Sequence, residues 1–338
     1  MKRIPIMFTF NNNYCVPASA CFISIMEHAS KENDYYFYVL HSDITEEHEN
    51  MLKEDMNKYS NCHLEFINMN NKYEEEYNRV QNHSHFSKEL LYKLSCASIF
   101  SKESKIIITD VDVIFLDDIA IMYDALDEKE DYYYAGIGVA EKKSPSIYRG
   151  NLYLKFTDLE KDMLEKGVGA GFLLVNLKKI RQDGIEEKML KFLNDNSDRL
   201  IQIEQDVINI VCYKHIKRMP HYYMVCSYEY DNYKNGKDFS SIKNPDDIEK
   251  EKYALENPVQ LHFATSIKPW KYTNCTKSEI WFKYFEMSYF SDLYLKQIKK
   301  NGKSVNSFFV KFMKTKTYKV LLKIYHLILR PFKKRRGA

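Results

Sequence analysis

The sequence predicts an α/β fold with a mainly parallel sheet, and three observations lead to this prediction. Apolar segments typical of buried strands alternate with segments that have the pattern of helices along residues 4–116. Polar residues directly follow several of these strands, as they do at the ligand-binding edge of open α/β sheets. The chain has 338 residues, of which 45% are hydrophobic, enough for one large domain and an appendage. A disordered or fibrous protein is excluded.

The elements of the first half follow one another in a regular order. Asp43 or Thr45 can cap the second helix, and Glu46 and Glu47 fall in its first turn, where the helix dipole favours acidic residues. The alternation implies parallel strands joined by right-handed crossovers. Strands are expected at 4–10, 35–40, 63–67 and 105–109, and helices at 18–29, 45–59 and 88–100.

The predicted strands end in polar groups that together can form a nucleotide-sized site. These groups are residues 11–13, residues 41–43, Asn68, and the pair Asp110 and Asp112. The sequence contains neither a G-x-G-x-x-G nor a Walker motif, so no glycine-rich helix entry is available to hold phosphates. A metal ion is therefore expected to hold the phosphates instead.

Asp110 and Asp112 are the most informative residues of the chain. They interrupt the apolar run 106–116, which has the composition of a buried strand. Two carboxylates one residue apart at the edge of a sheet are suited to holding a divalent cation. The alternative interpretation is that Asp112 caps a turn and Asp110 is an incidental polar residue.

Three later segments carry further candidate site residues. A glycine-rich turn at 167–171 leads into a second buried strand, and glycines there allow a close approach of backbone to a ligand or simply form a bulge. Residues 204–206, Glu-Gln-Asp, precede an apolar helix, where acidic residues are often only dipole partners. His262 lies at the end of a short strand, and Lys268 follows it. A histidine at such a place can complete a metal site, although a single histidine is more often structural.

Cysteine usage and the N-terminus indicate where the protein works. The seven cysteines are scattered and unpaired in spacing, so neither a disulfide framework nor a structural zinc site is expected. Residues 11–13, all asparagine, end the first apolar run too early for a signal peptide. No apolar stretch reaches the roughly 18 residues that span a bilayer. We expect a cytoplasmic protein.

The C-terminal segment differs in charge from the rest of the chain. After Asp292 the sequence has fourteen basic residues and no acidic one, which leaves 36 basic against 47 acidic residues before it, a formal charge of −11. Apolar residues interleave with those cations, so residues 296–338 are predicted to lie on an anionic membrane surface. Packing of this segment on the body as an ordinary helix is the alternative. Nucleic-acid binding is not expected, because no nucleic-acid-binding motif accompanies the charge.

Taken together and in this order, the motifs resemble the retaining glycosyltransferases of family 8, which include bacterial lipopolysaccharide galactosyl- and glucosyltransferases and glycogenin. The resemblance covers roughly residues 4–275. Its elements are the first strand with residues 11–14, the D-x-D of Asp110 and Asp112, the strand 170–179, the triplet 204–206, and His262 with the sequence 268–270. It implies a GT-A fold, a Rossmann-like mixed and mainly parallel sheet flanked by helices.

The resemblance also implies a donor and a metal. The donor is a UDP-sugar, and Mn²⁺, with Mg²⁺ as the alternative, is held by Asp110, Asp112 and His262. Lys268 would add positive charge at the diphosphate. The residues that the resemblance places around the donor are Thr9, Asn11, Asn13, Tyr14, Lys93, Asp110, Val111, Asp112, Gly169, Ala170, Thr265 and Lys268.

Catalytic and acceptor residues follow from the same resemblance. Glu204 and Gln205 correspond to the residues beside the anomeric carbon, where relatives usually carry Asp-Gln, and His85 matches a position near the acceptor. Lys93 stands where the family commonly has an arginine. Gly169 replaces a usual asparagine and Thr265 a usual glycine, so the hexose is left open, as are the acceptor and the oligomeric state.

Two rival functions remain at this point. A phosphatase of the haloacid dehalogenase type also has an aspartate pair after a strand, with Asp110 as the nucleophile. A non-catalytic carbohydrate-binding relative is the other. For the domain organisation we expect a catalytic domain at 1–275 and a helical, basic membrane-association region at 276–338.

Overall fold

The computed structural model describes residues 1–81, 86–138, 150–234, 245–272 and 275–291. The strands are β1 (Lys2–Thr9), β2 (Asn33–His41), β3 (Cys62–Asn68), β4 (Lys105–Thr109), β5 (Val113–Phe115), β6 (Tyr134–Gly138), β7 (Val168–Asn176), β8 (Ile216–Met219), β9 (Val225–Cys226) and β10 (Gln260–His262). The α-helices are α1 (Cys15–His28), α2 (Glu46–Met56), α3 (Glu74–Arg79), α4 (Cys96–Ile99), α5 (Ala120–Tyr123), α6 (Asp158–Glu165), α7 (Leu177–Gln182), α8 (Ile185–Asn196), α9 (Glu204–Val211), α10 (Glu229–Lys234), α11 (Pro245–Glu256) and α12 (Ser278–Phe285). Short 3-10 helices are η1 (Asn12–Tyr14), η2 (Lys88–Ser95), η3 (Tyr153–Lys155), η4 (Ser197–Arg199), η5 (Tyr213–His215) and η6 (His221–Tyr223).

The main sheet is mixed and mainly parallel, as the sequence predicts. Its strand order is β3-β2-β1-β4-β7-β6-β8, and β7 pairs antiparallel with both of its neighbours. The chain moves outward from β1 to β3 and then returns to place β4 on the other side of β1. The carboxyl ends of β1 and β4 therefore form a topological switch point, where ligands bind in open α/β sheets.

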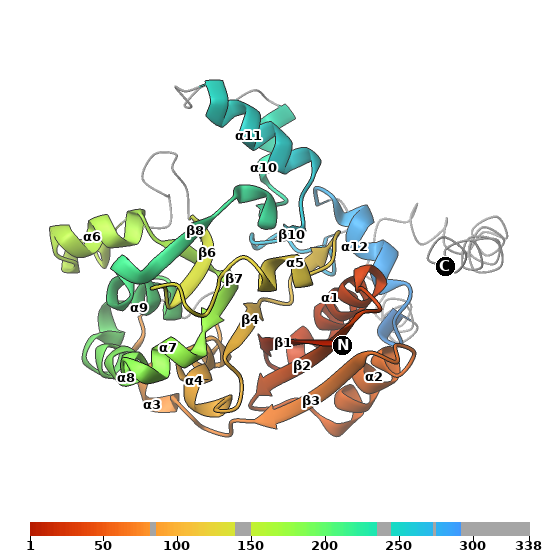
Figure 1. Cartoon of the computed structure of the whole chain (residues 1–338), viewed down its shortest axis with the longest axis horizontal. Helices are drawn as coiled ribbons and strands as arrows, with labels where there is room; N and C mark the ends of the chain where they lie inside the picture. The colour runs from red at the N-terminus through yellow and green to blue at the C-terminus, as the bar shows by residue number, and fades with distance from the viewer. Residues whose placement is uncertain (82–85, 139–149, 235–244, 273–274, 292–338) are drawn as a thin grey trace, which may run out of the picture.

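Alternate side chains of the strands enter two separate cores. Ile4, Ile6 and Phe8 of β1 belong to the core that includes α1 and α12, whereas Met7 faces the core of η2, α4, α7, α8 and α9. Figure 1 shows α1, α2 and α12 gathered on one side of the molecule and α7, α8 and α9 on the other. Helices thus cover the sheet on both faces, which is the layered arrangement that buries a mainly parallel sheet.

A second sheet, which the sequence pattern does not indicate, lies against α1. It has the order β5-β10-β9, with β5 and β10 antiparallel. The apolar run 106–116 is therefore not one strand, because β4 belongs to the main sheet and β5 to the small one. Asp110 and Asp112 lie on the link between the two sheets.

One local prediction is confirmed with a change of helix type, and one is wrong. The segment 88–100 is helical as expected, but it consists of the 3-10 helix η2 followed by one turn of α4. Glu89 and Lys93 of η2 are buried, and their charged groups form hydrogen bonds with Ser42 and Asp110, respectively. Such tertiary contacts override the local preference for an α-helix. The glycines expected in a turn at 167–171 mostly lie within β7, where they leave room for other side chains.

Helix α12 packs against α1 as part of the body. Its Trp281 is fully buried and its Phe285 is 3% exposed, and both belong to the core of α1. The division of the chain at residue 275 stays a prediction, because residues 292–338 lie outside the described part of the structure. Among the described residues, no helix has the length and apolar character needed to cross a bilayer.

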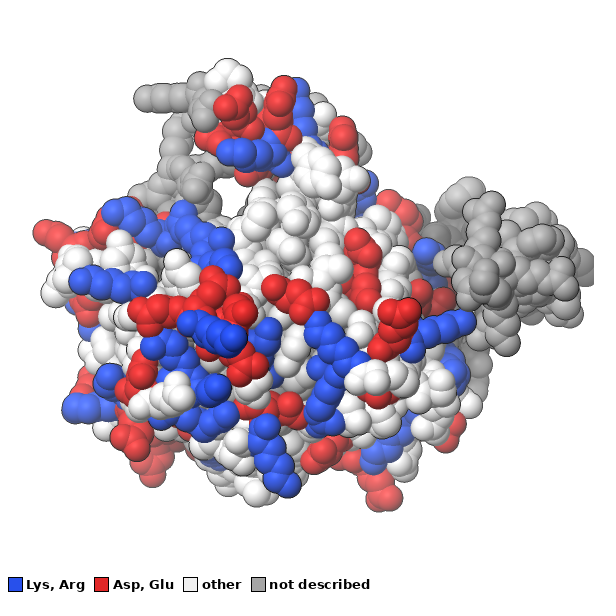
Figure 2. Space-filling model, viewed as in Figure 1, with Lys and Arg blue, Asp and Glu red and all other residues white. Residues whose placement is uncertain are grey.

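Charge is evenly mixed on the face of the body seen in Figure 2. Lysine and arginine side chains alternate with aspartate and glutamate over most of this face, and an uncharged zone lies between the body and the charged top of the molecule, where Figure 1 places α10 and α11. This face of the described body therefore presents no large field of one sign, in contrast to the C-terminal segment of the sequence.

Candidate active site and metal centre

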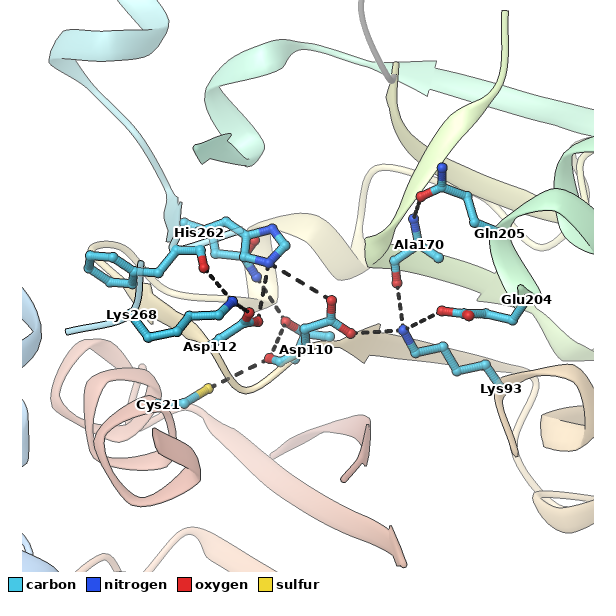
Figure 3. A network of polar contacts seen from close by, with 12 residues as sticks. Cys21, Lys93, Asp110, Asp112, Ala170, Glu204, Gln205, His262 and Lys268 are labelled. Carbon is cyan, nitrogen blue, oxygen red and sulfur yellow. Dashed lines mark hydrogen bonds and ion pairs between the residues drawn. The ribbon is translucent and has the colours of Figure 1, made fainter. Parts of the chain in front are cut away.

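Asp110, Asp112 and His262 converge at the switch point of the sheet. One ligand atom from each of the three residues lies within 4.8 Å of the others. His262 Nε2 lies 3.1 Å from Asp112 Oδ1 and 3.9 Å from Asp110 Oδ2 (Figure 3). The sequence separates the histidine from the aspartates by some 150 residues, and long-range strand pairing brings them together.

The pairing of β10 with β5 places the histidine. His262 is in register with Val113 of β5, and the backbone N–H of Phe263 donates to the carbonyl of Asp112 at 2.9 Å. On the other side, the N–H of Asp110 donates to the carbonyl of Gly171 at 3.0 Å, so the beginning of β7 lies beside Asp110. Main-chain hydrogen bonds thus hold the link 110–112 against both β7 and β10.

The residues present fit a divalent cation. Two carboxylates and an imidazole are common ligands for such ions. His262 is 8% exposed, and its Nδ1 has no hydrogen-bond partner among the described residues, so the buried ring has a polar atom that a bound group could satisfy. Gly171 leaves the space that the ring occupies, because a Cβ atom there would lie 2.8 Å from His262 Cε1.

Lys268 neutralises part of the negative charge at the cluster. Its ammonium donates to Asp112 Oδ2 and, at 2.6 Å, to the carbonyl of Phe263. Burial opposes the ionisation of Asp112, but the positive charge of Lys268 and the contact with His262 outweigh it, so the pKa of this carboxyl lies well below its usual range. Asp112 is therefore ionised at neutral pH and ready to bind a cation.

Lys93 connects the aspartates to the catalytic candidates on α9. Its side chain is fully buried, and its ammonium donates to Asp110 Oδ1 at 2.8 Å, to the carbonyl of Ala170 at 3.0 Å and to Glu204 Oε1 at 3.0 Å. These three bonds use the three hydrogens of a lysine ammonium. All three hydrogen-bond donors of Lys93 are thus engaged by the protein itself, although the resemblance places Lys93 at the UDP-sugar.

Glu204 and Gln205 form the first turn of α9 and face the same cluster. Gln205 Oε1 accepts a hydrogen bond from the N–H of Ala170 at 3.0 Å (Figure 3). Burial raises the pKa of Glu204, the charge of Lys93 opposes this shift and the charge of Asp110 adds to it, so the pKa is about 7. A carboxyl group in this state can act as a proton carrier or as a negative charge close to neutral pH.

Other predicted donor residues surround the end of β1. Thr9 is 5% exposed and its Oγ1 has no partner among the described residues, whereas the exposed Asn13 donates its N–H to Asn11 Oδ1 at 3.1 Å. The ring of Tyr14 lies 6.0 Å from that of Trp270, next to the loop that carries Lys268. Burial and the nearby Asp112 raise the pKa of the Tyr14 hydroxyl, so it stays protonated.

The remaining predicted residues differ in where the structure places them. Val111 is buried between the two aspartates, and Gly169 faces Met224 at the beginning of β7. Thr265 Oγ1 accepts a hydrogen bond from the N–H of Ile267 and so shapes the loop that leads to Lys268. His85 lies outside the described residues, and its assignment to the acceptor stays a prediction.

The expected strand-end site is only partly assembled. The N–H of Asn12 donates to Asp43 Oδ1 at 2.8 Å, so the ends of β1 and β2 are joined to each other. Asn68 lies at the end of the outermost strand β3, where its side chain accepts a bond from the N–H of Asn70. Asn68 therefore belongs to a local turn. The residues that surround Asp110 and Asp112 come instead from β7, β10, η2 and α9.

Two residues that support the site are missing from the sequence-based assignment. Gly171 provides the space for His262, and the buried Gln260 donates to Thr109 Oγ1 at 2.8 Å, directly before Asp110. Gln260 and His262 are two residues apart on one strand and so share a face. This period of two was a usable signal for Gln260, whereas the space needed at Gly171 depends on a contact that only the fold creates.

Replacing Gly171 with alanine is expected to weaken metal binding by about 10- to 100-fold, the range found when supporting residues of metal sites are changed. The new Cβ would lie 2.8 Å from His262 Cε1 and 3.1 Å from Asp110 Oδ2, so the imidazole must move away from the carboxylates. Titration calorimetry with MnCl₂ measures the change. The matched control is Gly169→Ala, whose Cβ would meet the flexible end of Met224 at 3.3 Å. Equal metal affinity in Gly171→Ala and Gly169→Ala would contradict the proposed location of the ion.

Comparisons with known proteins identify the family and the fold. The family model described as "Glycosyl transferase family 8" matches residues 5–274. General stress protein A of Bacillus subtilis (strain 168) is 22% identical over 267 residues, which are 77% of this chain and 85% of that protein.

Solved glycosyltransferases share the fold. The bifunctional glycosyltransferase WbbM superposes with a TM-score of 0.68 at 18% identity, over 87% of this chain and 51% of WbbM, so the chain spans about half of that protein. The galactosyltransferase LgtC, solved in complex with donor and acceptor sugar analogues, gives a TM-score of 0.63 at 18% identity over 85% of this chain and 96% of LgtC. The GT-A fold is thereby confirmed, and the chain belongs to glycosyl transferase family 8.

Proposed function

We propose that this protein transfers a hexose, galactose or glucose, from a UDP-sugar to a glycan acceptor and retains the α configuration of the donor. The observation that carries the proposal is the convergence of Asp110, Asp112 and His262 within 4.8 Å at the switch point of the sheet. The likeness to LgtC, a galactosyltransferase solved with donor and acceptor sugar analogues, supports a sugar donor of this kind. Mn²⁺ is the proposed ion, and Mg²⁺ is the alternative.

With a divalent cation bound, the cluster would suit a nucleoside diphosphate leaving group. A divalent cation bound by Asp110, Asp112 and His262 would neutralise charge on the diphosphate. Lys268, which is held by Asp112 and the Phe263 carbonyl, places a second positive charge next to the same site. This fixed charge stabilises a departing UDP without moving in the reaction.

Glu204 and Gln205 are the proposed groups beside the anomeric carbon. Glu204 is 4% exposed and hydrogen-bonded to Lys93, so its carboxylate is held in one place by a cation. A fixed negative group favours the positive charge that develops on the sugar ring as UDP leaves. We favour this electrostatic part for Glu204 over direct attack on the sugar, because its Oε1 is already engaged by the ammonium of Lys93.

A thermal-shift screen tests the proposal directly. A ligand that binds only the native state raises its stability with the logarithm of ligand concentration over Kd. We expect UDP-galactose or UDP-glucose to raise the melting temperature only when MnCl₂ is present, with GDP-sugars as the control. Stabilisation by phosphomonoesters alone would favour the phosphatase. If no nucleotide-sugar stabilises the protein or is hydrolysed, the non-catalytic alternative is supported.

We further propose that the protein works on the cytoplasmic face of a membrane, where it glycosylates a lipid-linked or cell-surface glycan in lipopolysaccharide or capsule synthesis. The support is the sequence of residues 296–338, which combines cations with apolar residues and has no acidic residue. These residues lie outside the described part of the structure.

Deleting residues 300–338 should release the protein from vesicles that contain phosphatidylserine while UDP-sugar hydrolysis stays unchanged. The deletion begins after Ser291, the last residue that the structure describes, so it removes none of the contacts described above. Vesicle cosedimentation measures the binding, and pure phosphatidylcholine vesicles are the control. Undiminished binding of the deleted protein to the anionic vesicles would refute the membrane proposal.

A further inference from the structure

The backbone directly before the catalytic candidates is strained. Ile203 has φ 43° and ψ −109°, close to the values of the first central residue in a type II′ β-turn. The turn is closed by a hydrogen bond from the N–H of Gln205 to the carbonyl of Gln202 at 2.9 Å. This position favours glycine, and a β-branched residue there is a genuine outlier. Among the described residues with positive φ that are not glycine, Ile203 alone is β-branched.

The strained turn is held by Asp206 and by the core. Asp206 is fully buried, and its Oδ2 accepts hydrogen bonds from the N–H groups of Ile201 at 2.7 Å and Gln202 at 2.9 Å. The side chain of Ile203 is also fully buried and belongs to the same core as Val207. Strain of this kind persists only where the surroundings determine the conformation, and it is concentrated at functional sites.

The direction of the turn decides where α9 begins. Glu204 and Gln205 follow Ile203 at once, and both reach the site from the first turn of the helix, Glu204 to Lys93 and Gln205 to the N–H of Ala170. If Ile203 relaxed to an ordinary negative φ, the peptide before Glu204 would rotate and both contacts would be lost. The strained conformation is therefore coupled to the placement of the two side chains.

We propose that Ile203 and Asp206 are positioning residues, and that the carboxylate of Asp206 clamps a strained turn which aims Glu204 and Gln205 at the donor sugar. The placement of Glu204 and Gln205 at the donor sugar rests on the proposed function. The strained backbone of Ile203 and its stabilisation by Asp206 do not. Stability measurements therefore test the clamp by themselves, and kinetics test its purpose.

The first experiment compares Ile203→Gly with Ile203→Ala by denaturant unfolding. Both variants lose the apolar side chain, and they differ only by the Cβ atom. At ordinary backbone positions the alanine variant is the more stable of such a pair, but at Ile203 the glycine variant should unfold at the higher denaturant concentration. Ile208 in the middle of α9 is 1% exposed and gives the matched control. At this position the alanine variant should be more stable than the glycine variant. If the alanine variant at residue 203 were as stable as the glycine variant, the claim that the backbone at Ile203 is strained would be refuted.

The second experiment removes the clamp. In the Asp206→Ala background the advantage of glycine over alanine at residue 203 should shrink or vanish, because the turn is then free to relax. With donor and MnCl₂, Asp206→Ala should lower kcat for UDP-sugar hydrolysis by about 10- to 100-fold, the effect of small misplacements at reacting groups. The donor KM should change little, since the metal ligands belong to other elements. Asp206→Asn, which keeps an acceptor oxygen, should recover most of kcat.

The outcomes separate the two claims. A folded Asp206→Ala protein with unchanged kcat would refute the positioning role even if the turn is strained. If no nucleotide-sugar is turned over by the wild-type protein, the proposed function fails, while the glycine and alanine comparison still decides whether Asp206 holds a strained turn.

Discussion

Asp110→Asn should bind Mn²⁺ at least about 100-fold more weakly than the wild-type protein, because changes of supporting residues alone cost 10- to 100-fold in metal sites. The asparagine keeps the shape of the side chain and can still accept the bond from Lys93, which is 2.8 Å long in the structure. What it removes is a negative charge within 4.8 Å of Asp112 and His262. Transfer from the UDP-sugar should fall with metal binding. Titration calorimetry and a coupled assay for UDP release measure the two quantities.

Asp55→Asn is the matched control for this change. Asp55 is a fully buried carboxyl on α2, where its Oδ1 accepts a hydrogen bond from the N–H of Tyr289, whereas the side chain of Asp110 is 25% exposed. Burial raises the pKa of Asp55 to about 7, so its replacement removes a titratable group from the interior, away from the proposed metal site. Metal affinity should be unchanged in this variant. If Asp110→Asn bound the ion as tightly as Asp55→Asn, the ion would have to lie elsewhere.

The order of the first strands and helices could be predicted from the sequence because local patterns encode it. The helix α2 begins after Thr45, whose hydroxyl accepts the N–H of His48, as the capping pattern indicates. Asp110 and Asp112 were found for the same reason, since they directly follow an apolar strand. These predictions depend on residues close together in the sequence.

The split of the apolar run 106–116 between two sheets could not be predicted in this way. Residues on both sides of the aspartates are equally apolar, so the pattern contains no sign that β4 pairs with β7 while β5 pairs with β10. The partner strands come from distant parts of the chain. The same distance hides the reason for Gly171, whose neighbour His262 is known only from the fold.

Asp206 shows a second limit of the sequence. An acidic residue in the first turn of a helix is usually explained by the helix dipole. In the structure the residue is fully buried and bonded to two backbone N–H groups before the helix. The sequence gives no sign of the left-handed backbone at Ile203, because isoleucine is among the residues least expected there.

Lys93→Met should lower the free energy of unfolding by about 3–5 kcal/mol, the range for removing one partner of a buried ion pair. Methionine keeps the unbranched shape but leaves Asp110 and Glu204 without the ammonium that both contact. Glu204 is 4% exposed, so water does not readily replace the bond that this carboxylate loses. Denaturant unfolding in metal-free buffer measures the loss.

Lys105→Met is the control for the charge effect. Lys105 is 9% exposed and donates to the carbonyls of Tyr123 and Leu126, so its loss leaves no carboxylate without a partner. The destabilisation should be clearly smaller than for Lys93→Met. Equal losses would show that Lys93 matters for packing and hydrogen bonding alone, and not for the charges of Asp110 and Glu204.

The contact between Lys93 and Glu204 leads to a prediction about two departures from the family pattern that the resemblance implies. The resemblance places Lys93 where the family commonly has arginine and Glu204 where it usually has aspartate, so a shorter cation would face a longer acid here. Lys93→Arg alone should overfill a fully buried site, and Glu204→Asp alone should leave a gap next to an ammonium that now lies 3.0 Å from Glu204 Oε1. The double variant restores the combined length, so it should be more stable and more active than either single variant. Additive losses in a double-mutant cycle would show that the two departures are independent of each other.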